Sequence, residues 1–215
     1  MHLRLRALFA ALISAAALEI PVRSRTSLRT RPRRPSPLPT HDEVVTAPKL
    51  SATERLRLRK DGECTRKVRS GRGGACLHVV ETAEDEDVVW RQLSDVSAWA
   101  EMMRGVKSSR VAPRRDGDVY ERARFSITKF RLPCALVLAE APAPSGGRAL
   151  RFALDPDARS PAVQECSGAW VVERCGDVTR VSLAANIRAT PLVPGLLVEA
   201  IAAKALNRAT AWLRR

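Results

Sequence analysis

The stretch that decides the fold runs from Glu165 to Arg215 and reads ECSGAWVVERCGDVTRVSLAANIRATPLVPGLLVEAIAAKALNRATAWLRR. It opens with two segments of alternating apolar residues joined by a Gly176-Asp177 turn. Pro194-Gly195 then begins a pattern typical of a long helix, rich in Ala and without further Gly or Pro. A hairpin followed by one long helix predicts a helix packed over a sheet, and such a layout can enclose an apolar cavity.

The chain upstream of this stretch shows the same regular patterning from residue 75 onward. The sequence predicts a strand over Cys76–Thr82, a helix over VVWRQL that begins at a Thr82 capping box, and a short helix over VSAWAEMM capped by Asp95. Further strands are predicted at Val106–Pro113, Val119–Ile127, Arg131–Ala141 and Ala149–Leu154. Consecutive strands with short turns favour an antiparallel meander, so we expect an α+β fold.

Residues 1–40 have the composition of a targeting leader. Ala7–Leu18 is a short apolar run after a basic start, and Ile20–Thr40 holds six Arg and no acidic residue. A signal-like segment followed by a transit-like one is similar to the two-part leader of proteins sent to plastids with extra membranes. We therefore expect a plastid (chloroplast) protein whose mature form begins after about residue 40. The alternatives are a mitochondrial or simple chloroplast presequence, or a secretory signal followed by a linker.

Residues 41–74 are polar and basic and end in SGRGG, which predicts a disordered linker with a short helix near Ala52–Lys60. The ligand-binding domain is then expected to span 75–215 and to fold on its own. Residues 1–74 carry 17 Lys/Arg and 6 Asp/Glu, and so a net +11 of the total +14. Because residues 75–215 carry 20 and 17, for a net +3, the basic excess does not describe the domain, and no nucleic-acid partner is expected.

The residues that could carry chemistry do not form a catalytic or metal-binding pattern. The five Cys have no CxxC spacing and the three His have no ligand spacing with them, so we expect isolated thiols, no metal and no cofactor. His78 is the only His in the domain, and a structural role is the simplest interpretation. Asp155 and Asp157 flank Pro156 in an expected solvated loop. No residue is therefore assigned as catalytic.

Two pieces of the chain resemble the START-like superfamily, also called SRPBCC or helix-grip proteins, and in particular its polyketide cyclase and coenzyme-Q-binding branch. The first piece is VVWRQLSDVSAWAEMMRGVKSSRV at 88–111, which matches a helix pair and the following strand. The matching positions are Asp95 and Trp99 in this piece, and Gly168, Trp170, Thr179, Arg180, Pro194 and Gly195 in the C-terminal stretch. The chain departs from the pattern at Arg104, where the family often has Pro.

The resemblance implies a curved antiparallel sheet wrapped around the long C-terminal helix, with an apolar cavity between them. Members bind lipids, sterols, isoprenoid quinones or polyketides; some are enzymes and many only carry their ligand. The apolar residues expected to line such a cavity are Phe125, Ile127, Leu136, Leu138, Phe152, Leu154, Trp170, Leu183, Ile187, Leu197, Ile201 and Trp212.

The first functional hypothesis is a carrier or chaperone of a hydrophobic small molecule such as an isoprenoid quinone, a lipid or a pigment-related compound. A polyketide cyclase- or aromatase-like enzyme using the same cavity is the alternative. A third hypothesis is a protein-interaction domain with a vestigial cavity. We expect a monomer that makes peripheral membrane contact.

Overall fold

The structure is a computed structural model that describes residues 44–70, 73–113, 121–127, 132–158, 163–190 and 205–214. All of them belong to one compact unit, Pro35–Arg215. The elements in chain order are α2 (Ala52–Asp61), β1 (Glu63–Ser70), β2 (Gly73–Thr82), α3 (Glu86–Ser94), η1 (Val96–Ala98), α4 (Trp99–Met102), β3 (Val106–Val111), β4 (Glu121–Ile127), β5 (Leu132–Pro142), η2 (Pro144–Gly146), β6 (Arg148–Leu154), β7 (Val163–Cys175), β8 (Val178–Ala189) and η3 (Ala211–Arg214).

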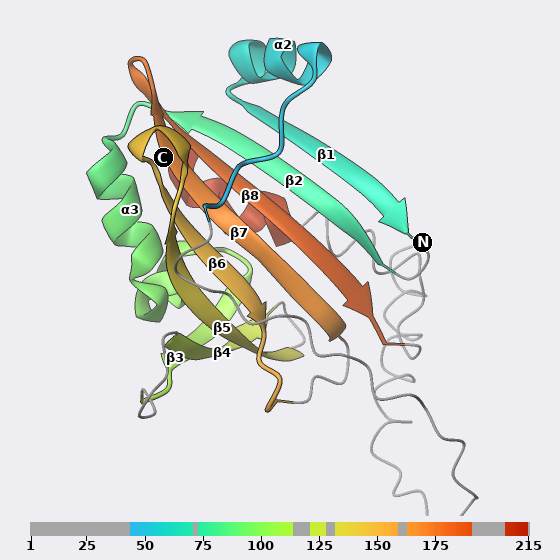
Figure 1. The fold of residues 1–215 in the computed structure, drawn as a ribbon. Coiled ribbons are helices and arrows are strands. Elements are labelled where there is room, and N and C mark those ends of the chain that lie inside the picture. The colour runs from blue at the N-terminus through green and yellow to red at the C-terminus, as the bar shows by residue number, and fades with distance from the viewer. Residues whose placement is uncertain are drawn as a thin grey trace, which may run out of the picture. The chain divides into compact units, whose positions relative to one another are not determined.

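The strands form one twisted antiparallel sheet in the order β1-β2-β8-β7-β6-β5-β4-β3 (Figure 1). Strands β3 to β8 are an uninterrupted meander, and β2 pairs with β8, so the start and the end of the strand region lie side by side. Each strand of the meander matches a predicted one within a few residues. The α+β class and the helix-grip fold expected from the sequence are confirmed.

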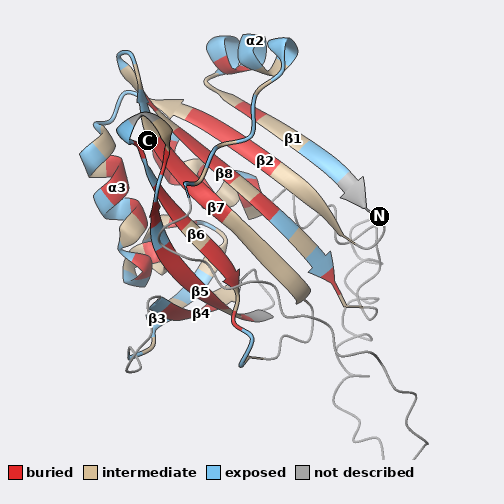
Figure 2. Cartoon of the chain, in the orientation of Figure 1, coloured by how far each residue is buried: buried red, intermediate tan, exposed pale blue. Residues whose placement is uncertain are grey.

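The inner face of the sheet carries the main core. Alternate residues of the central strands pack there against α3, η1, α4 and the C-terminal segment in one cluster. On α3, Val89 and Leu93 are completely buried, because apolar positions four residues apart lie on the same helix face. Figure 2 shows the buried residues concentrated along the central strands, with exposure increasing toward the strand ends.

The outer face of the sheet is covered by residues that precede the predicted domain. Leu58 of α2 packs with Cys64 of β1 and with Leu77 and Val79 of β2. Further along, Val45 packs near Ala149, and its amide donates to the Pro142 carbonyl at 2.9 Å. The expected linker at 41–74 is therefore wrong over α2 and β1, although the short helix predicted there is confirmed as Ala52–Asp61.

The helix α2 is fixed at both ends and tied to the sheet. Ser51 and Glu54 form a reciprocal capping box at its start, and Gly62 adopts a left-handed φ of 71° at its end. Glu54 also pairs with Arg66 of β1. The hydrogen bonds from Arg66 lower the pKa of the Glu54 carboxyl to about 2.

The helix pair that follows β2 is capped by two aspartates. Asp85 caps α3 by accepting from the Asp87 amide at 2.8 Å, so the capping residue is not Thr82 as predicted. Thr82 instead accepts from the Glu84 amide in the turn before the helix. Asp95 caps η1 by accepting from the Ala98 amide at 3.3 Å, as predicted.

The predicted closing helix is described only in its last part. Residues 205–209 are helical, and η3 continues to Arg214. Pro194-Gly195 and the rest of 191–204 lie outside the described residues. Among the described helices, none is long and apolar enough to cross a membrane.

Candidate functional site

An aromatic group fixes the inner face of the sheet near the helix pair. Trp99 of α4 stacks on Phe125 of β4 with ring centroids 5.3 Å apart, and it meets Trp170 of β7 edge-on at 6.5 Å. The Trp99 indole Nε1 donates to the Leu93 carbonyl at 2.9 Å, which satisfies its buried donor. This group holds α4 rigidly against the sheet.

Close packing requires a glycine at position 168, two residues before Trp170. A Cβ on Gly168 would collide with the Ala184 carbonyl and with the Phe152 ring. Gly168 therefore lets the Phe152 ring lie directly on β7, beside the aromatic group. This contact gives a physical reason for the Gly-x-Trp pattern in this strand.

The structure brings most of the expected cavity residues together on the inner face. Phe125, Leu136, Leu138, Phe152, Trp170, Leu183 and Trp212 are buried in the inner cluster, and Leu154 and Ile187 are partly buried against it. Leu197, Ile201 and the side chain of Ile127 lie outside the described residues. The described members of the expected cavity set are therefore neighbours on one face of the sheet, as the alternation along the strands predicts.

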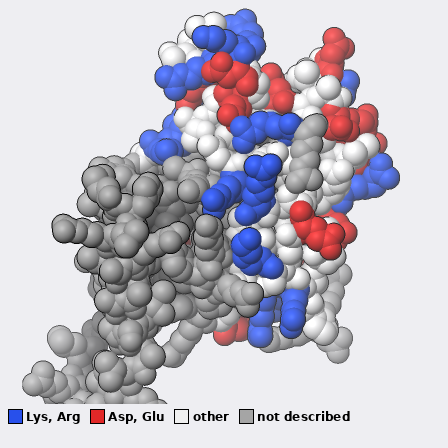
Figure 3. Space-filling model, turned by 180° about the vertical axis from the view of Figure 1, so that it is seen from behind, with Lys and Arg blue, Asp and Glu red and all other residues white. Residues whose placement is uncertain are grey.

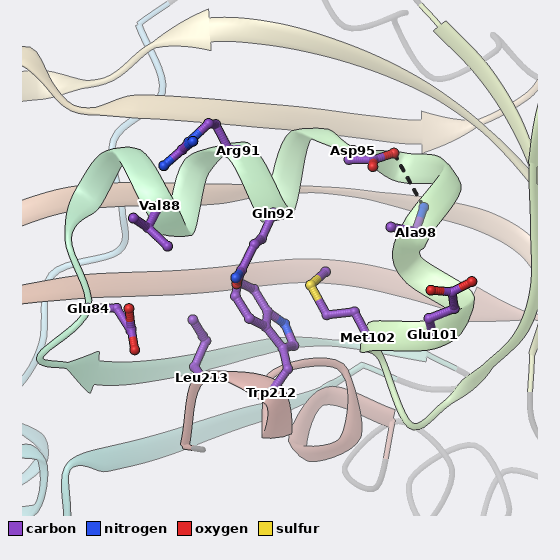
Figure 4. A pocket seen from close by; sticks show the side chains of 10 residues that line it. All are labelled: Glu84, Val88, Arg91, Gln92, Asp95, Ala98, Glu101, Met102, Trp212 and Leu213. Atoms are coloured by element: carbon purple, nitrogen blue, oxygen red, sulfur yellow. Dashed lines mark hydrogen bonds between the residues drawn. The ribbon is translucent and has the colours of Figure 1, made fainter.

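A pocket opens beside this cluster, between the helix pair and the C-terminal segment. We call it the α3–η3 pocket; its volume is about 680 Å³, within the range that small-molecule sites occupy. Its described lining is Glu84, Val88, Arg91, Gln92, Asp95, Ala98, Glu101, Met102, Trp212 and Leu213 (Figure 4). Only Trp212 was among the residues predicted from the sequence.

Trp212 connects the pocket with the core. Its side chain belongs to the inner cluster, is 8 % exposed and also lines the pocket. Figure 4 shows the indole projecting from η3 between Gln92 of α3 and Met102 of α4. The indole Nε1 is buried and has no hydrogen-bond partner in the part of the chain that the structure describes. An unpaired buried donor is unfavourable, so this nitrogen is available to an acceptor that enters the pocket.

The rim of the pocket is polar and its described charges are mainly negative. Glu84 and Glu101 lie at opposite ends of the pocket in Figure 4, and Asp95 lies between them on the helix side. Arg91 supplies the positive charge, and its Nε donates to the Asp87 carbonyl of its own helix at 3.3 Å. The rim therefore differs in sign from the chain as a whole, which is strongly basic.

Basic side chains gather on one face of the molecule. On the face seen from behind in Figure 3, Lys and Arg side chains form a loose band down the described surface, with acidic side chains beside it. Such a band can meet an anionic surface.

The thiols are unsuited to nucleophilic catalysis. All five cysteines are free, and burial raises the pKa of Cys134 to about 11 and that of Cys166 to about 12. Both thiols are therefore protonated at neutral pH, whereas the reactive form is the thiolate. Neither of them lines the α3–η3 pocket.

His78 is buried beneath the β1 edge and away from the pocket. Its Nδ1 lies 2.7 Å from Thr65 Oγ1, and its Nε2 lies 3.6 Å from Glu63 Oε2, which in turn pairs with Arg214 at 2.7 Å. Desolvation lowers the pKa of His78, with Arg214 adding to the effect and Glu63 opposing it. The arrangement agrees with the structural role expected from the sequence.

Asp155 departs from its predicted place in a solvated loop. It is 8 % exposed and pairs with Arg122 of β4 at 2.7 Å, and Asp157 contacts the same guanidinium at 3.2 Å. Because burial of either charge alone is costly, the two become buried together as a hydrogen-bonded pair across the β4–β5–β6 region.

The twisted sheet, the packed helix pair and the C-terminal segment define a helix-grip protein with a pocket beside its inner core. The chain belongs to the polyketide cyclase / dehydrase and lipid transport family, whose sequence profile matches residues 85–214. This places it in the START-like superfamily, as the resemblance implied. No curated protein sequence matches the chain.

Solved structures share the fold at low sequence identity. A STAR-related lipid transfer protein of Xanthomonas axonopodis is 16 % identical with a TM-score of 0.57, over 72 % of this chain and 95 % of that one. The human StAR-related lipid transfer protein 5 is 13 % identical with a TM-score of 0.54, over 75 % and 90 %. The lipid transfer and protein localization domain of human StarD13 is 13 % identical with a TM-score of 0.54, over 71 % and 85 %.

Sequence reasoning missed most of the pocket because its helical residues are polar or small. One signal was present: Val88, Arg91, Gln92 and Asp95 follow the i, i+3, i+4, i+7 spacing of a single helix face. That face adjoins the buried face of Val89 and Leu93. The C-terminal segment that completes the pocket comes from more than a hundred residues away, and local patterns do not reveal such a contact.

Proposed function

We propose that this protein binds and carries a hydrophobic small molecule, and that the ligand enters or rests in the α3–η3 pocket. The observation that carries the proposal is the pocket itself, about 680 Å³, with an apolar wall that continues through Trp212 into the inner cluster. Val88, Met102 and Leu213 line that wall, and a tail packed against them would be removed from water. Hydrophobic ligand binding is also what the family's description supports.

For the ligand we propose an isoprenoid quinone, a membrane lipid or a pigment-related compound. Each combines a long apolar part with a small polar head, which suits a pocket with an apolar wall and a polar rim. Exchange with a bilayer would use transient surface contact, for which the basic band in Figure 3 is suited. We propose that the carrier acts as a monomer in the plastid.

A cyclase- or aromatase-like enzyme is the second candidate, and the family's description supports it equally. Such an enzyme needs a poised acid, base or nucleophile at the ligand. The described pocket lining contains carboxylates but no His, Tyr or Cys, and the buried His78 lies outside it. The pocket therefore favours the carrier over the enzyme.

The test is binding of the uncharged dye Nile red to the full-length chain, together with mass spectrometry of lipids extracted from the purified protein. Val88→Trp fills the pocket from the rigid helix α3, and we expect it to weaken dye binding about tenfold or more. Val68→Trp is the matched control, because Val68 is 55 % exposed on β1 and does not line the pocket.

Thermal unfolding of both variants shows whether the fold is kept. If the wild-type chain binds no dye and yields no lipid, the carrier function is wrong. Equal weakening by both variants would place the bound dye outside the α3–η3 pocket.

A further inference from the structure

The α3–η3 pocket has three features that together restrict its ligand. Its wall is apolar, one of its lining residues holds a buried hydrogen-bond donor, and the described charges at its two ends are negative. Each feature acts on a different part of a ligand: the tail, the polar group next to the tail, and the head. The combination can therefore be used to choose among ligand classes.

The donor is the indole Nε1 of Trp212, which is buried without a partner among the described residues, in a side chain that is only 8 % exposed. Indole N–H can only donate, so the missing partner is an acceptor. The side chains of Gln92 and Met102 flank the indole in Figure 4. Both have several rotatable bonds, and a small displacement of either one gives a ligand oxygen access to Nε1.

The charges at the pocket ends act on the head of the ligand. An anionic head at one end meets the carboxylate of Glu84 and at the other end that of Glu101, and both side chains are exposed. The carboxylate of Asp95 also offers no donor to an anion, and its Oδ1 accepts from the Ser97 hydroxyl and the Ala98 amide. The Arg91 guanidinium extends along α3 and away from Trp212 in Figure 4, so it does not offset these carboxylates near the donor.

We propose, on the basis of the carrier function above, that the pocket selects an uncharged amphiphile with a carbonyl or ester oxygen next to its apolar tail. Trp212 Nε1 donates to that oxygen, Val88, Met102 and Leu213 contact the tail, and Glu84 and Glu101 disfavour anionic lipids such as free fatty acids. A quinone or an acyl ester fits this description and a carboxylate does not.

The experiment compares a pyrene-labelled fatty acid with its methyl ester, which has the same tail and fluorophore but no charge. Pyrene emission during titration of the full-length chain gives both dissociation constants. Because the ester also prefers apolar surroundings in general, the decisive quantity is how the acid-to-ester ratio changes between variants. We expect the double variant Glu84→Gln, Glu101→Gln to lower that ratio about threefold to tenfold, mainly by improving binding of the acid.

The matched control is Glu121→Gln with Asp177→Asn, which removes the same charge at exposed positions that do not line the pocket. The control should leave the ratio unchanged. A second variant, Trp212→Phe, should weaken ester binding about twofold to tenfold by loss of one hydrogen bond, with thermal unfolding checked in parallel.

The outcomes separate this inference from the carrier function. If wild-type protein binds the ester but the Glu84, Glu101 variant keeps the wild-type ratio, charge selection is wrong and the carrier function stands. If Trp212→Phe is folded and binds the ester as tightly as wild type, the hydrogen bond is wrong. If neither probe binds to wild-type protein, the carrier function itself fails and the inference fails with it.

Discussion

At the residue scale, burial decides the chemistry of the titratable groups more than sequence context does. His78 is completely buried with its Nδ1 bonded to Thr65, while its Nε2 has no hydrogen-bond partner among the described residues. Asp155 is buried as a pair with Arg122, although it was expected in a solvated loop. In each case the partner lies on another segment of the chain, 13 residues away for His78 and Thr65 and 33 residues away for Arg122 and Asp155. A pattern of alternating residues does not carry this information.

The lowered pKa of His78 predicts a pH dependence of stability. The unfolded chain binds a proton at His78 near the ordinary pKa of about 6.5, whereas the folded chain binds it only at lower pH. Between those two pKa values the unfolded state holds more protons, so stability falls as the pH falls through this interval. His78→Gln removes the titrating group and should flatten the change in melting temperature between about pH 7.5 and about pH 5.5.

Thermal unfolding of the wild type and of His78→Gln at each pH is the measurement. A Gln amide can still bond to Thr65, so the variant retains that contact. An unchanged pH slope in the variant would show that other groups, and not His78, cause the acid sensitivity.

At the element scale, the main difference between expectation and structure is the added strand β1 and the packing of helix α2 against the sheet. Strand β1 reads ECTRKVRS, with polar side chains on both faces, so it lacks the apolar alternation that marks a strand. Edge strands tolerate this composition, because charged side chains there oppose pairing with other chains. By contrast, β4 to β8 have buried faces that the sequence shows plainly, and their order and turns were predicted. The same alternation predicted the apolar residues on the inner face of the sheet. It did not predict the polar residues that line the α3–η3 pocket.

The packing of α2 and β1 predicts that residues 75–215 alone are less stable than residues 44–215. The shorter fragment loses Leu58 and Cys64, uncovers Leu77 and Val79, and leaves β2 as an unprotected edge. Loss of this apolar burial should lower the free energy of unfolding by about 3 kcal/mol or more. Urea unfolding of the two fragments measures the difference, and the full-length chain is the reference. If the two fragments had the same free energy of unfolding, α2 and β1 would not stabilise the fold, and a domain that begins at residue 75 would be complete.

At the scale of the whole molecule, the net charge is distributed unevenly along the chain. Most of the basic excess precedes residue 75, while the family match begins at residue 85. Within the domain, the described pocket rim is mainly acidic, and Lys and Arg side chains form a band on the face shown in Figure 3. A carrier with this arrangement can approach an anionic membrane without attracting anionic lipids into its pocket. The acidic pocket rim and the basic surface band are therefore both compatible with the proposed carrier function.

The leader gives the last prediction, which concerns where the mature protein begins. Residues 1–40 combine a short apolar run with an Arg-rich, acid-free segment, and we propose that they direct the protein to the plastid and are then removed. The structure narrows the cleavage point, because Val45 already donates to the Pro142 carbonyl and Ala47 packs against the outer face. Cleavage should therefore fall between about residue 40 and residue 44, since removal of Val45 would break this packing. Mass spectrometry of the native N-terminus measures the site; a protein that retains Met1, or one that begins after Ala47, would contradict the prediction.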